Sequence, residues 1–565
     1  MQCRTANDIE GTSVAETKGR SLGPDLGSGL TVALVSIPEG MAYALVAGVN
    51  PVYGLYTGML TTIVASLTGS TSLLIVTLTN ALALVAGDQL AGLDTDDPIR
   101  ALATLTFLVG IMMTLLGALR MGSMIRFVSR EVMAGFIFVT ALLIVLGQLK
   151  DLVGYHPEGT HGKVSQAIAI LSNPSAWSNS TTILGLAGIA FLVAVKATRF
   201  KRFADVLVIV FTTVAVAFLG LAGIELVGDI ADVPRGLDAL PSFVLPDFTL
   251  IPALLAGAFA ATVVGLSESS GVGAAYPNPN GKKSDMSKDF LGQGLGNLAG
   301  SFFQAMPAGG SLSRTGINAS GGAQTRMSGV FSGLLLAIVL VLFGSSAELI
   351  PLAGLAALLI VIGAEIMLKE GRVLMRAWKT SRYNTFIAVA TIILGVSHDL
   401  TVAIFGGVIL SLIAFAVNAS DRVTCFELER APDGNWVERP TPEALPPDET
   451  TILEIRGPLN FASVYSFAEL FPDPKGAHGA TLILSCQDQE LQSLTSVDWV
   501  ENFLADLSAA GARLILAEVG PALLTDLEKS GLLEKLGAHN IFPASDVKLA
   551  SLNAAYAAVQ PQDAE

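Results

Sequence analysis

The sequence predicts an all-α polytopic membrane domain followed by a small cytoplasmic α/β domain. Hydrophobic residues make up 52% of the 565 residues and the mean hydropathy is +0.61. Charged residues make up only 14%, whereas a typical soluble protein carries about 25%. Helix-length apolar segments follow one another from residue 29 to residue 417. Beyond them the composition becomes polar and acidic, which indicates a soluble domain.

We expect five regions along the chain. Residues 1–26 form a polar cytoplasmic segment, where no signal peptide is evident because an apolar core is lacking. Residues 27–420 form the transmembrane domain and 421–449 a proline-rich linker. Residues 450–558 form the soluble domain, and 559–565 a C-terminal tail.

About fourteen apolar segments are predicted as membrane spans, with loose ends. They cover residues 29–48, 52–68, 76–92, 101–119, 132–150, 181–197, 204–224, 250–272, 289–306, 312–322, 328–345, 348–367, 384–396 and 399–417.

Loop charges predict the orientation of these spans. Basic residues cluster in the loops after spans four, six, eight and twelve, whereas acidic residues cluster after spans three and seven. Because Lys and Arg are enriched in cytoplasmic loops, we expect both termini in the cytoplasm and a multi-pass protein of the cell membrane. The basic residues include Arg120, Arg126, Arg130, Lys196, Arg199, Lys201, Arg202, Lys282, Lys283, Lys369, Arg372, Arg376, Lys379 and Arg382.

The soluble domain carries most of the net charge. Residues 421–565 contain 23 acidic and 9 basic residues, so this region has a charge of −14, against −1 for the rest of the chain. An acidic surface disfavours nucleic acid or anionic lipid as the partner of this domain.

Matched polar interruptions divide the spans into two similar halves of seven. Span one carries Ser36 to Gly40, and span three follows the glycine- and hydroxyl-rich segment 68–72. Span eight carries Ser267 to Gly271, and span ten opens with Pro307 to Arg314. We therefore expect the first and third spans of each half to be interrupted, as in an inverted-repeat transporter. Two half-helix N-termini meeting near the midplane would present N–H groups and positive dipole ends to a small anion.

Several motifs in order resemble the signature of the sulfate permease (SulP) family. They are Pro38-Glu-Gly-Met-Ala-Tyr-Ala44, Pro51-Val-Tyr-Gly-Leu-Tyr56, Glu268-Ser269, Gly292 to Asn297, Pro307, Gly310 to Thr315, and Asn318. The resemblance implies a fourteen-helix arrangement of core and gate subdomains, usually dimeric, with a cytoplasmic STAS domain. It also implies that the anion lies between short strands leading into spans three and ten.

The same resemblance implies the site residues. Segment 72–77, including Ser72 and Thr77, and residues Gly310, Ser311 and Leu312 would supply backbone amides to the substrate, with Glu268 lining the pocket. A coupling sodium ion could lie at Glu268, Gly310 and Leu312. Glu39 and Glu268 are intramembrane carboxylates, which are functional by default, so we expect them in ion coupling. Arg314 could attract the anion or pair with a carboxylate.

The C-terminal region resembles a STAS domain in Leu453 to Phe461 and in Gly531 to Gly537. Its pattern predicts strands at 451–455, 480–485 and 512–518, alternating with helices at 461–470, 496–509 and 520–530. A cytosolic protein is a possible partner. Phosphorylated STAS proteins carry Asp-Ser where this chain has Ser493-Leu494, so we do not expect the usual phosphorylation switch.

No catalytic constellation is visible, and we expect neither an enzyme nor a cofactor other than a coupling H⁺ or Na⁺. No nucleophile elbow or phosphate-binding loop appears, so ATP-driven transport is disfavoured. The five histidines and Cys3, Cys425 and Cys486 have no metal-like or disulfide-like spacing.

The leading hypothesis is a secondary active transporter of sulfate, bicarbonate or a dicarboxylate that works by alternating access, coupled to H⁺ or Na⁺. An anion exchanger or chloride carrier is an alternative within the same architecture. A nucleobase carrier is a further alternative, against which the STAS-like region argues. A membrane-anchored STAS sensor or scaffold without transport also stays open, because a fold does not establish a function.

Overall fold

The computed structural model describes residues 22–560, apart from 161, 222, 421–422, 458, 460–462 and 492. The predicted N-terminal segment 1–26 and tail 559–565 therefore lie largely outside the described residues. The chain divides into two compact units, Met1–Ser411 and Leu412–Glu565. The boundary between the two units thus falls within the last predicted span, a few residues before the predicted end of the transmembrane domain at 420.

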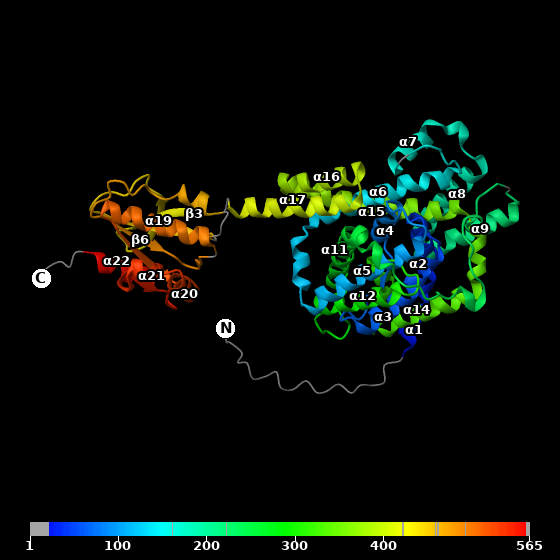
Figure 1. Ribbon diagram of the computed structural model, residues 1–565, viewed down its shortest axis with the longest axis horizontal. Helices are drawn as coiled ribbons and strands as arrows, with labels where there is room; N and C mark the ends of the chain where they lie inside the picture. Colours follow the sequence, from blue (N-terminus) through cyan, green and yellow to red (C-terminus); the bar gives the residue numbers. More distant parts are fainter. Residues whose placement is uncertain are drawn as a thin grey trace. The chain divides into compact units, whose positions relative to one another are not determined.

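The first unit is helical, and each of the fourteen predicted spans overlaps a helix in it (Figure 1). Among the described residues, nine helices are long and apolar enough to cross a membrane, and Val52–Thr68 and Arg382–Ser397 are shorter apolar helices. The helices are α1 (Gly23–Val46), α2 (Val52–Tyr56), η1 (Thr57–Thr61), α3 (Thr62–Thr68), α4 (Asn80–Ala91), α5 (Pro98–Ala118), α6 (Arg130–Val153), α7 (Lys163–Ser172), α8 (Asn179–Lys196), α9 (Ala204–Leu219), α10 (Val227–Ile230), α11 (Ile251–Ala275), α12 (Met286–Ser301), α13 (Leu312–Ser320), α14 (Met327–Phe343), α15 (Leu352–Thr380), α16 (Arg382–Ser397) and α17 (Leu400–Ser420).

Helices from the two halves of the sequence pack against each other. In one group, α1 lies along α14 and α12 lies along α5. In the other, α15 packs on both α6 and α8, and α16 packs on α6. These two groups are the core and gate subdomains that the resemblance implies. At the crossing of α1 and α2, a Cβ atom on Gly54 would collide with the carbonyl of Gly40, so position 54 needs glycine for this close approach.

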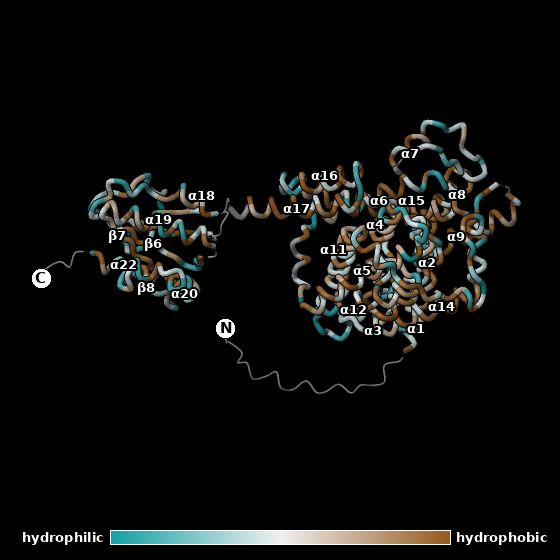
Figure 2. The backbone as a smooth tube through the Cα atoms, viewed as in Figure 1, coloured by the Kyte–Doolittle hydropathy of each residue, from teal (hydrophilic) through white to brown (hydrophobic). Residues whose placement is uncertain are grey.

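Large apolar side chains stay exposed on helices of this unit. Much of the backbone of this unit is coloured as hydrophobic in Figure 2. Phe218 is 87% exposed, and Leu219, Leu342, Phe343 and Ile409 are also exposed. A soluble protein rarely leaves so much apolar surface in water, so this surface is suited to contact lipid.

The expectation that spans one and eight are interrupted is wrong. Helix α1 continues through Pro38, and α11 continues through the serine-rich segment 267–271. In α11 the hydroxyls of Ser267 and Ser270 donate to the carbonyls of Val263 and Leu266, at 2.7 and 2.8 Å. Serine hydroxyls that bond back to the preceding turn are satisfied within a helix and do not have to break it.

The expectation of breaks in spans three and ten is confirmed. Each of these spans begins as a two-residue strand and continues as a half-helix: β1 (Val76–Thr77) precedes α4, and β2 (Gly309–Gly310) precedes α13. The two strands pair antiparallel, with Val76 opposite Gly310 and Thr77 opposite Gly309. Non-helical backbone is thereby satisfied inside the protein, as a lipid environment requires.

The second unit contains a six-stranded sheet of order β4-β3-β5-β6-β7-β8. The pairs from β5 to β8 are parallel, whereas β3 is antiparallel to β4 and β5. Its elements are β3 (Thr424–Arg430), β4 (Trp436–Pro440), β5 (Thr450–Arg456), α18 (Val464–Ala468), β6 (Thr481–Ser485), α19 (Leu494–Ala510), β7 (Arg513–Val519), α20 (Pro521–Lys529), α21 (Leu532–Leu536), β8 (Ile541–Pro543) and α22 (Ala550–Val559).

The predicted linker 421–449 is not a simple linker, because it carries β3 and β4. Cys425 and Leu428 are buried in the sheet's cores, and Leu428 packs with Ile452 and Ile483. The prolines that suggested a linker lie at the end of β4 and beyond it, where a missing backbone N–H is tolerated at a sheet edge.

Candidate functional site

The two short strands bring the N-termini of α4 and α13 together. The N–H of Ser311 donates to the carbonyl of Ile75 at 2.9 Å, and the N–H of Ile75 donates to Thr315 Oγ1 at 3.0 Å. These bonds extend the pairing of β1 and β2 beyond the pair of Val76 and Gly310. Residues more than 230 positions apart are therefore held in one fixed register.

Each half-helix begins at a hydroxyl cap. Thr79 Oγ1 accepts from the N–H of Leu82, and Ser311 Oγ accepts from the N–H of Arg314, both at 3.4 Å. A helix leaves its first four N–H groups without partners inside the helix, and a cap satisfies only part of them.

Four backbone N–H groups at the two helix starts have no acceptor within the described part of the chain: those of Asn80, Ala81, Leu312 and Ser313. Leu312 is 41% exposed, so the start of α13 faces open space. Two helix N-termini with free N–H groups and positive dipole ends favour a bound anion.

Not every predicted substrate amide is available. The N–H of Gly310 donates to Ser269 Oγ at 2.9 Å, and the N–H of Ser311 is used by Ile75. Of the three residues predicted in this segment, only Leu312 keeps a free N–H. The reason is that β2 is a paired strand, and the free groups begin with the helix that follows it.

Ser72 and Thr77 do not lie at the helix starts. The N–H of Ser72 donates to Asn278 Oδ1 at 2.6 Å, so this residue belongs to the loop that leads into the break. Thr77 is 2% exposed and pairs with Gly309 in the sheet. Both residues hold the first segment in place, and the free N–H groups on this side belong to Asn80 and Ala81.

Glu268 reaches the start of α4 from α11. Its Oε2 atom accepts a hydrogen bond from Thr79 Oγ1 at 2.9 Å, and its side chain is half-buried. The carboxylate therefore lies beside the cap of the same helix whose N–H groups are free. A negative charge here competes with an anion unless a proton or a cation neutralises it.

Arg314 and Glu39 form a buried ion pair between α13 and α1. Arg314 is fully buried, Glu39 is 5% exposed, and Nη2 lies 3.1 Å from Glu39 Oε2. The pair lacks the alignment of a hydrogen bond, and Nε of Arg314 has no acceptor among the described residues. The Nη1 group donates to the carbonyl of Leu78 at 2.8 Å. Two roles were predicted for Arg314, to attract the anion or to pair with a carboxylate, and the structure shows the pairing. Glu39 is therefore not a free carboxylate.

Asn80 is a further polar group at the site. It is the first residue of α4, is 9% exposed, and its Nδ2 atom has no hydrogen-bond partner in the described structure. A buried amide without a partner is costly, which is typical of a group kept for a ligand.

Sequence reasoning did not assign a role to the amide side chain of Asn297, which holds the second break. Its Nδ2 atom donates to the carbonyl of Ala308 at 2.9 Å, and its Oδ1 atom accepts from the N–H of Ala308 at 2.8 Å. This bidentate contact imitates a strand neighbour for the segment before β2. The available signal was a lone Asn on an apolar, glycine-rich helix.

Comparison with known proteins decides the family. Residues 22–391 match the model of the sulfate permease family, and residues 441–547 match that of the STAS domain. The chain belongs to the sulfate permease family. The C-terminal region contains a STAS domain, as its resemblance to that domain implied.

Similar proteins are known from several organisms. A putative sulfate transporter of Bacillus subtilis, YvdB, is 27% identical over 92% of this chain and 96% of its own length. The structure of murine solute carrier 26 family member A9 in the inward-facing state has a TM-score of 0.83 at 19% identity, over 96% of this chain and 92% of that one. The transmembrane domain of the cyanobacterial bicarbonate transporter BicA has a TM-score of 0.60 at 24% identity, over 68% and 98%. These likenesses show that the chain shares the fold of the two structures over the parts that they cover.

Proposed function

We propose that this protein is a secondary active transporter of a small anion, with sulfate, bicarbonate and dicarboxylates as the candidate substrates. The observation that carries the proposal is the pair of opposed half-helix N-termini, which offer the free N–H groups of Asn80, Ala81, Leu312 and Ser313. The guanidinium of Arg314, which is paired with Glu39, also donates to the carbonyl of Leu78 just before α4 and so ties the two half-helix starts together. Similarity to proteins named as sulfate and bicarbonate transporters supports the same class of cargo.

Glu268 is the coupling residue in this proposal. Its carboxylate lies beside the cap of α4, whereas that of Glu39 is already neutralised by Arg314. A proton on Glu268, or a sodium ion held with backbone carbonyls of Gly310 and Leu312, would cancel a charge that repels the anion. Binding of the anion and of the coupling ion would then favour each other, which is the thermodynamic basis of symport.

Movement of the core against the gate would expose the site to each side in turn. We further propose a homodimer in the cell membrane with both termini in the cytoplasm, where the STAS domain meets a cytosolic partner. The basic loops after spans four, six, eight and twelve support this orientation.

The test is uptake of labelled sulfate, bicarbonate and succinate into proteoliposomes, with pH and sodium gradients imposed separately. If one gradient stimulates the uptake of one substrate, the experiment identifies the transported anion and the coupling ion together. Absence of flux under every gradient would favour the sensor or scaffold hypothesis.

The Glu268→Gln variant is expected to abolish concentrative uptake, because an amide takes up neither a proton nor a sodium charge. Glu365→Gln is the matched control, since Glu365 is 54% exposed in its side chain and pairs with Lys196 away from the half-helices. Concentrative uptake by Glu268→Gln at the rate of the control would contradict the assignment.

A further inference from the structure

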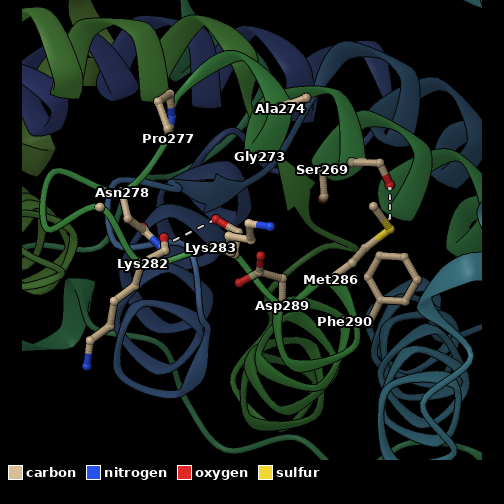
Figure 3. A pocket seen from close by; sticks show the side chains of 13 residues that line it. Ser269, Gly273, Ala274, Pro277, Asn278, Lys282, Lys283, Met286, Asp289 and Phe290 are labelled. Atoms are coloured by element: carbon tan, nitrogen blue, oxygen red, sulfur yellow. Dashed lines mark hydrogen bonds between the residues drawn. The ribbon is translucent and has the colours of Figure 1, made fainter. Parts of the chain in front are cut away.

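A cavity that is separate from the half-helix site lies between the last turns of α11 and the beginning of α12. Its volume is about 420 Å³, and loop 277–284 closes one side of it (Figure 3). Cavities that bind small molecules have volumes of about 300 to 1,000 Å³. The loop is basic, so the positive-inside rule assigns this end to the cytoplasmic side of the membrane.

The walls of this cavity are mainly apolar. Ala274 and Pro277 line it from the end of α11 and the loop, and Met286 and Phe290 line it from α12. The hydroxyl of Ser270 is satisfied by the carbonyl of Leu266 at 2.8 Å. An occupant therefore needs an apolar body to displace water from these walls.

Two exposed lysines of the loop, Lys282 and Lys283, line the cavity. The side chain of Lys283 lies above Asp289, whereas that of Lys282 points away from it (Figure 3). Neither lysine forms an ion pair with any residue that the structure describes. The unpaired charge of Lys283 favours an anionic group at this point.

The carboxylate of Asp289 does not cancel that charge by a direct ion pair, because it is engaged on its other side. Its Oδ1 atom accepts from the N–H groups of Ser70 and Thr71 at 2.6 and 2.8 Å, and Oδ2 accepts from Thr71 Oγ1 at 2.5 Å. Three hydrogen bonds hold this side chain toward the loop that precedes β1.

Three residues in the cavity wall also hold the two broken spans. Asp289 anchors Ser70 and Thr71, and Asn278 Oδ1 accepts from the N–H of Ser72 at 2.6 Å. Ser269 Oγ accepts from the N–H of Gly310 at 2.9 Å. A molecule in this cavity therefore lies directly behind the segments that position both half-helices.

We propose that this cavity is a regulatory site for an amphiphilic anion, with a carboxylate or phosphate head beside Lys283 and an apolar body against Met286 and Phe290. A small inorganic anion would leave water in contact with the apolar walls, and a cation would be repelled by the charge of Lys283. The binding half of this proposal is independent of the proposed function. The regulatory half, a change in transport rate on occupancy, rests on it.

Binding is tested on the full chain in nanodiscs of phosphatidylcholine, with a photoreactive dodecanoate analogue as the probe. We expect crosslinks in peptides that contain Ala274 or Met286 to Phe290. Lys283→Gln should reduce labelling about five-fold, the effect of losing roughly 1 kcal/mol of charge interaction. Lys282→Gln is the matched control, with one charge lost from the same loop, and should label as the parent chain does.

Gly273→Leu tests the cavity itself. A Cβ atom at this position meets only Thr71 Oγ1, at 3.7 Å, and collides with no backbone atom. The leucine side chain therefore fills part of the cavity. It should abolish labelling at these peptides. An unfolding temperature equal to that of the parent chain shows that the variant is folded.

Competitors distinguish the sources of the ligand. Unlabelled dodecanoate should compete about five-fold more strongly than dodecanol, because the alcohol lacks the charge. Competition by added phosphatidylglycerol would assign the site to a membrane lipid, and its failure would assign it to a soluble acyl anion. Either result supports an amphiphilic anion.

Equal labelling of the Lys282→Gln and Lys283→Gln variants would overturn the assignment, as would labelling of Gly273→Leu at the parent level or equally strong competition by dodecanol and dodecanoate. If the probe binds but dodecanoate leaves anion uptake unchanged in proteoliposomes that transport, the regulatory half is overturned. If no substrate moves in any liposome, the proposed function fails while the binding result still stands.

Discussion

Arg314 is fully buried, and its counter-ion comes from a helix almost 280 residues earlier in the chain. Glu39 on α1 neutralises a charge on α13 that would otherwise lie unpaired in the core. A buried pair adds little net stability compared with apolar residues, but removal of one partner leaves an uncompensated buried charge. The pair therefore acts mainly to hold the start of α13 in one position relative to α1.

Replacing Glu39 alone should be more damaging than replacing both partners. We expect Glu39→Gln to destabilise the membrane unit by about 3 to 5 kcal/mol, because Arg314 loses its counter-ion. Glu39→Gln combined with Arg314→Gln should lose less stability than Glu39→Gln alone, and therefore less than the sum of the two single changes. The measurement is the unfolding temperature of each purified variant, arranged as a double-mutant cycle. Additive losses would show that the two charges do not interact.

His156 provides a test of pH dependence outside the membrane spans. Its Nε2 atom lies 3.2 Å from Asp151 Oδ1, and its Nδ1 atom lies 3.7 Å from Glu225 Oε1. The hydrogen bond to Asp151 raises the pKa of His156 above its ordinary value. A raised pKa means that the folded state binds the proton more tightly than the unfolded state does, so the contribution is present at low pH and is lost as pH rises through the folded pKa.

We expect the unfolding temperature of the parent chain to fall slightly between about pH 6 and pH 8, the range in which histidine titrates. His156→Gln should remove this part of the pH dependence and leave the value at high pH nearly unchanged. The effect is small, because the histidine is partly exposed and solvent screens the pair. If the unfolding temperature of His156→Gln depended on pH as that of the parent chain does, the stabilising pair of His156 and Asp151 would be excluded.

At the scale of elements, the apolar segments and the two breaks were predictable because a lipid environment limits what a sequence can contain. The wrong prediction that spans one and eight are interrupted also arose from the composition of apolar segments. Serine and proline in an apolar run indicate either a break or a helix whose hydroxyls bond back to it. Only the contacts of Ser267 and Ser270 distinguish these cases.

The bidentate contact of Asn297 makes the second break testable at this scale. Asn297→Ala removes both bonds to Ala308 and leaves its buried N–H and carbonyl unsatisfied, at a cost of about 1 to 3 kcal/mol for each group. We expect anion uptake to be lost while the protein still purifies as a folded species. Uptake in proteoliposomes and gel filtration are the measurements.

Asn173→Ala serves as the control for this variant, because Asn173 is exposed at the end of α7 and, among the described residues, its side chain bonds only to the carbonyl of Ala169. It should transport as the parent chain does. Full uptake by Asn297→Ala would show that β2 and its neighbours hold the break without this amide.

At the scale of the whole molecule, the second unit has its own sheet and its own buried cores. Its sheet includes β3 and β4, which lie before the region predicted as the soluble domain. In the described structure β5 pairs with β3 on one side and β6 on the other. A fragment that begins at residue 450 would therefore expose a new sheet edge and lose the packing of Leu428.

Two fragments test this boundary. Residues 423–560 should be monomeric and unfold cooperatively, whereas residues 450–560 should aggregate or unfold at a lower temperature. Circular dichroism during heating and size-exclusion chromatography are sufficient measurements. Equal stability of the two fragments would mean that β3 and β4 are accessory to the domain.

The sequence by itself determined the membrane class, the division into two units, the positions of the spans and the two glycine-rich breaks, because hydrophobicity, charge and backbone freedom are local properties. It also pointed to Glu268, Arg314 and Glu39 as charges that an apolar interior does not tolerate without a role. Only the tertiary structure decided which N–H groups stay free, that Glu39 neutralises Arg314, and that Ser72 and Thr77 support the site without lining it. Those outcomes depend on contacts between residues hundreds of positions apart, for which a single sequence carries no local signal.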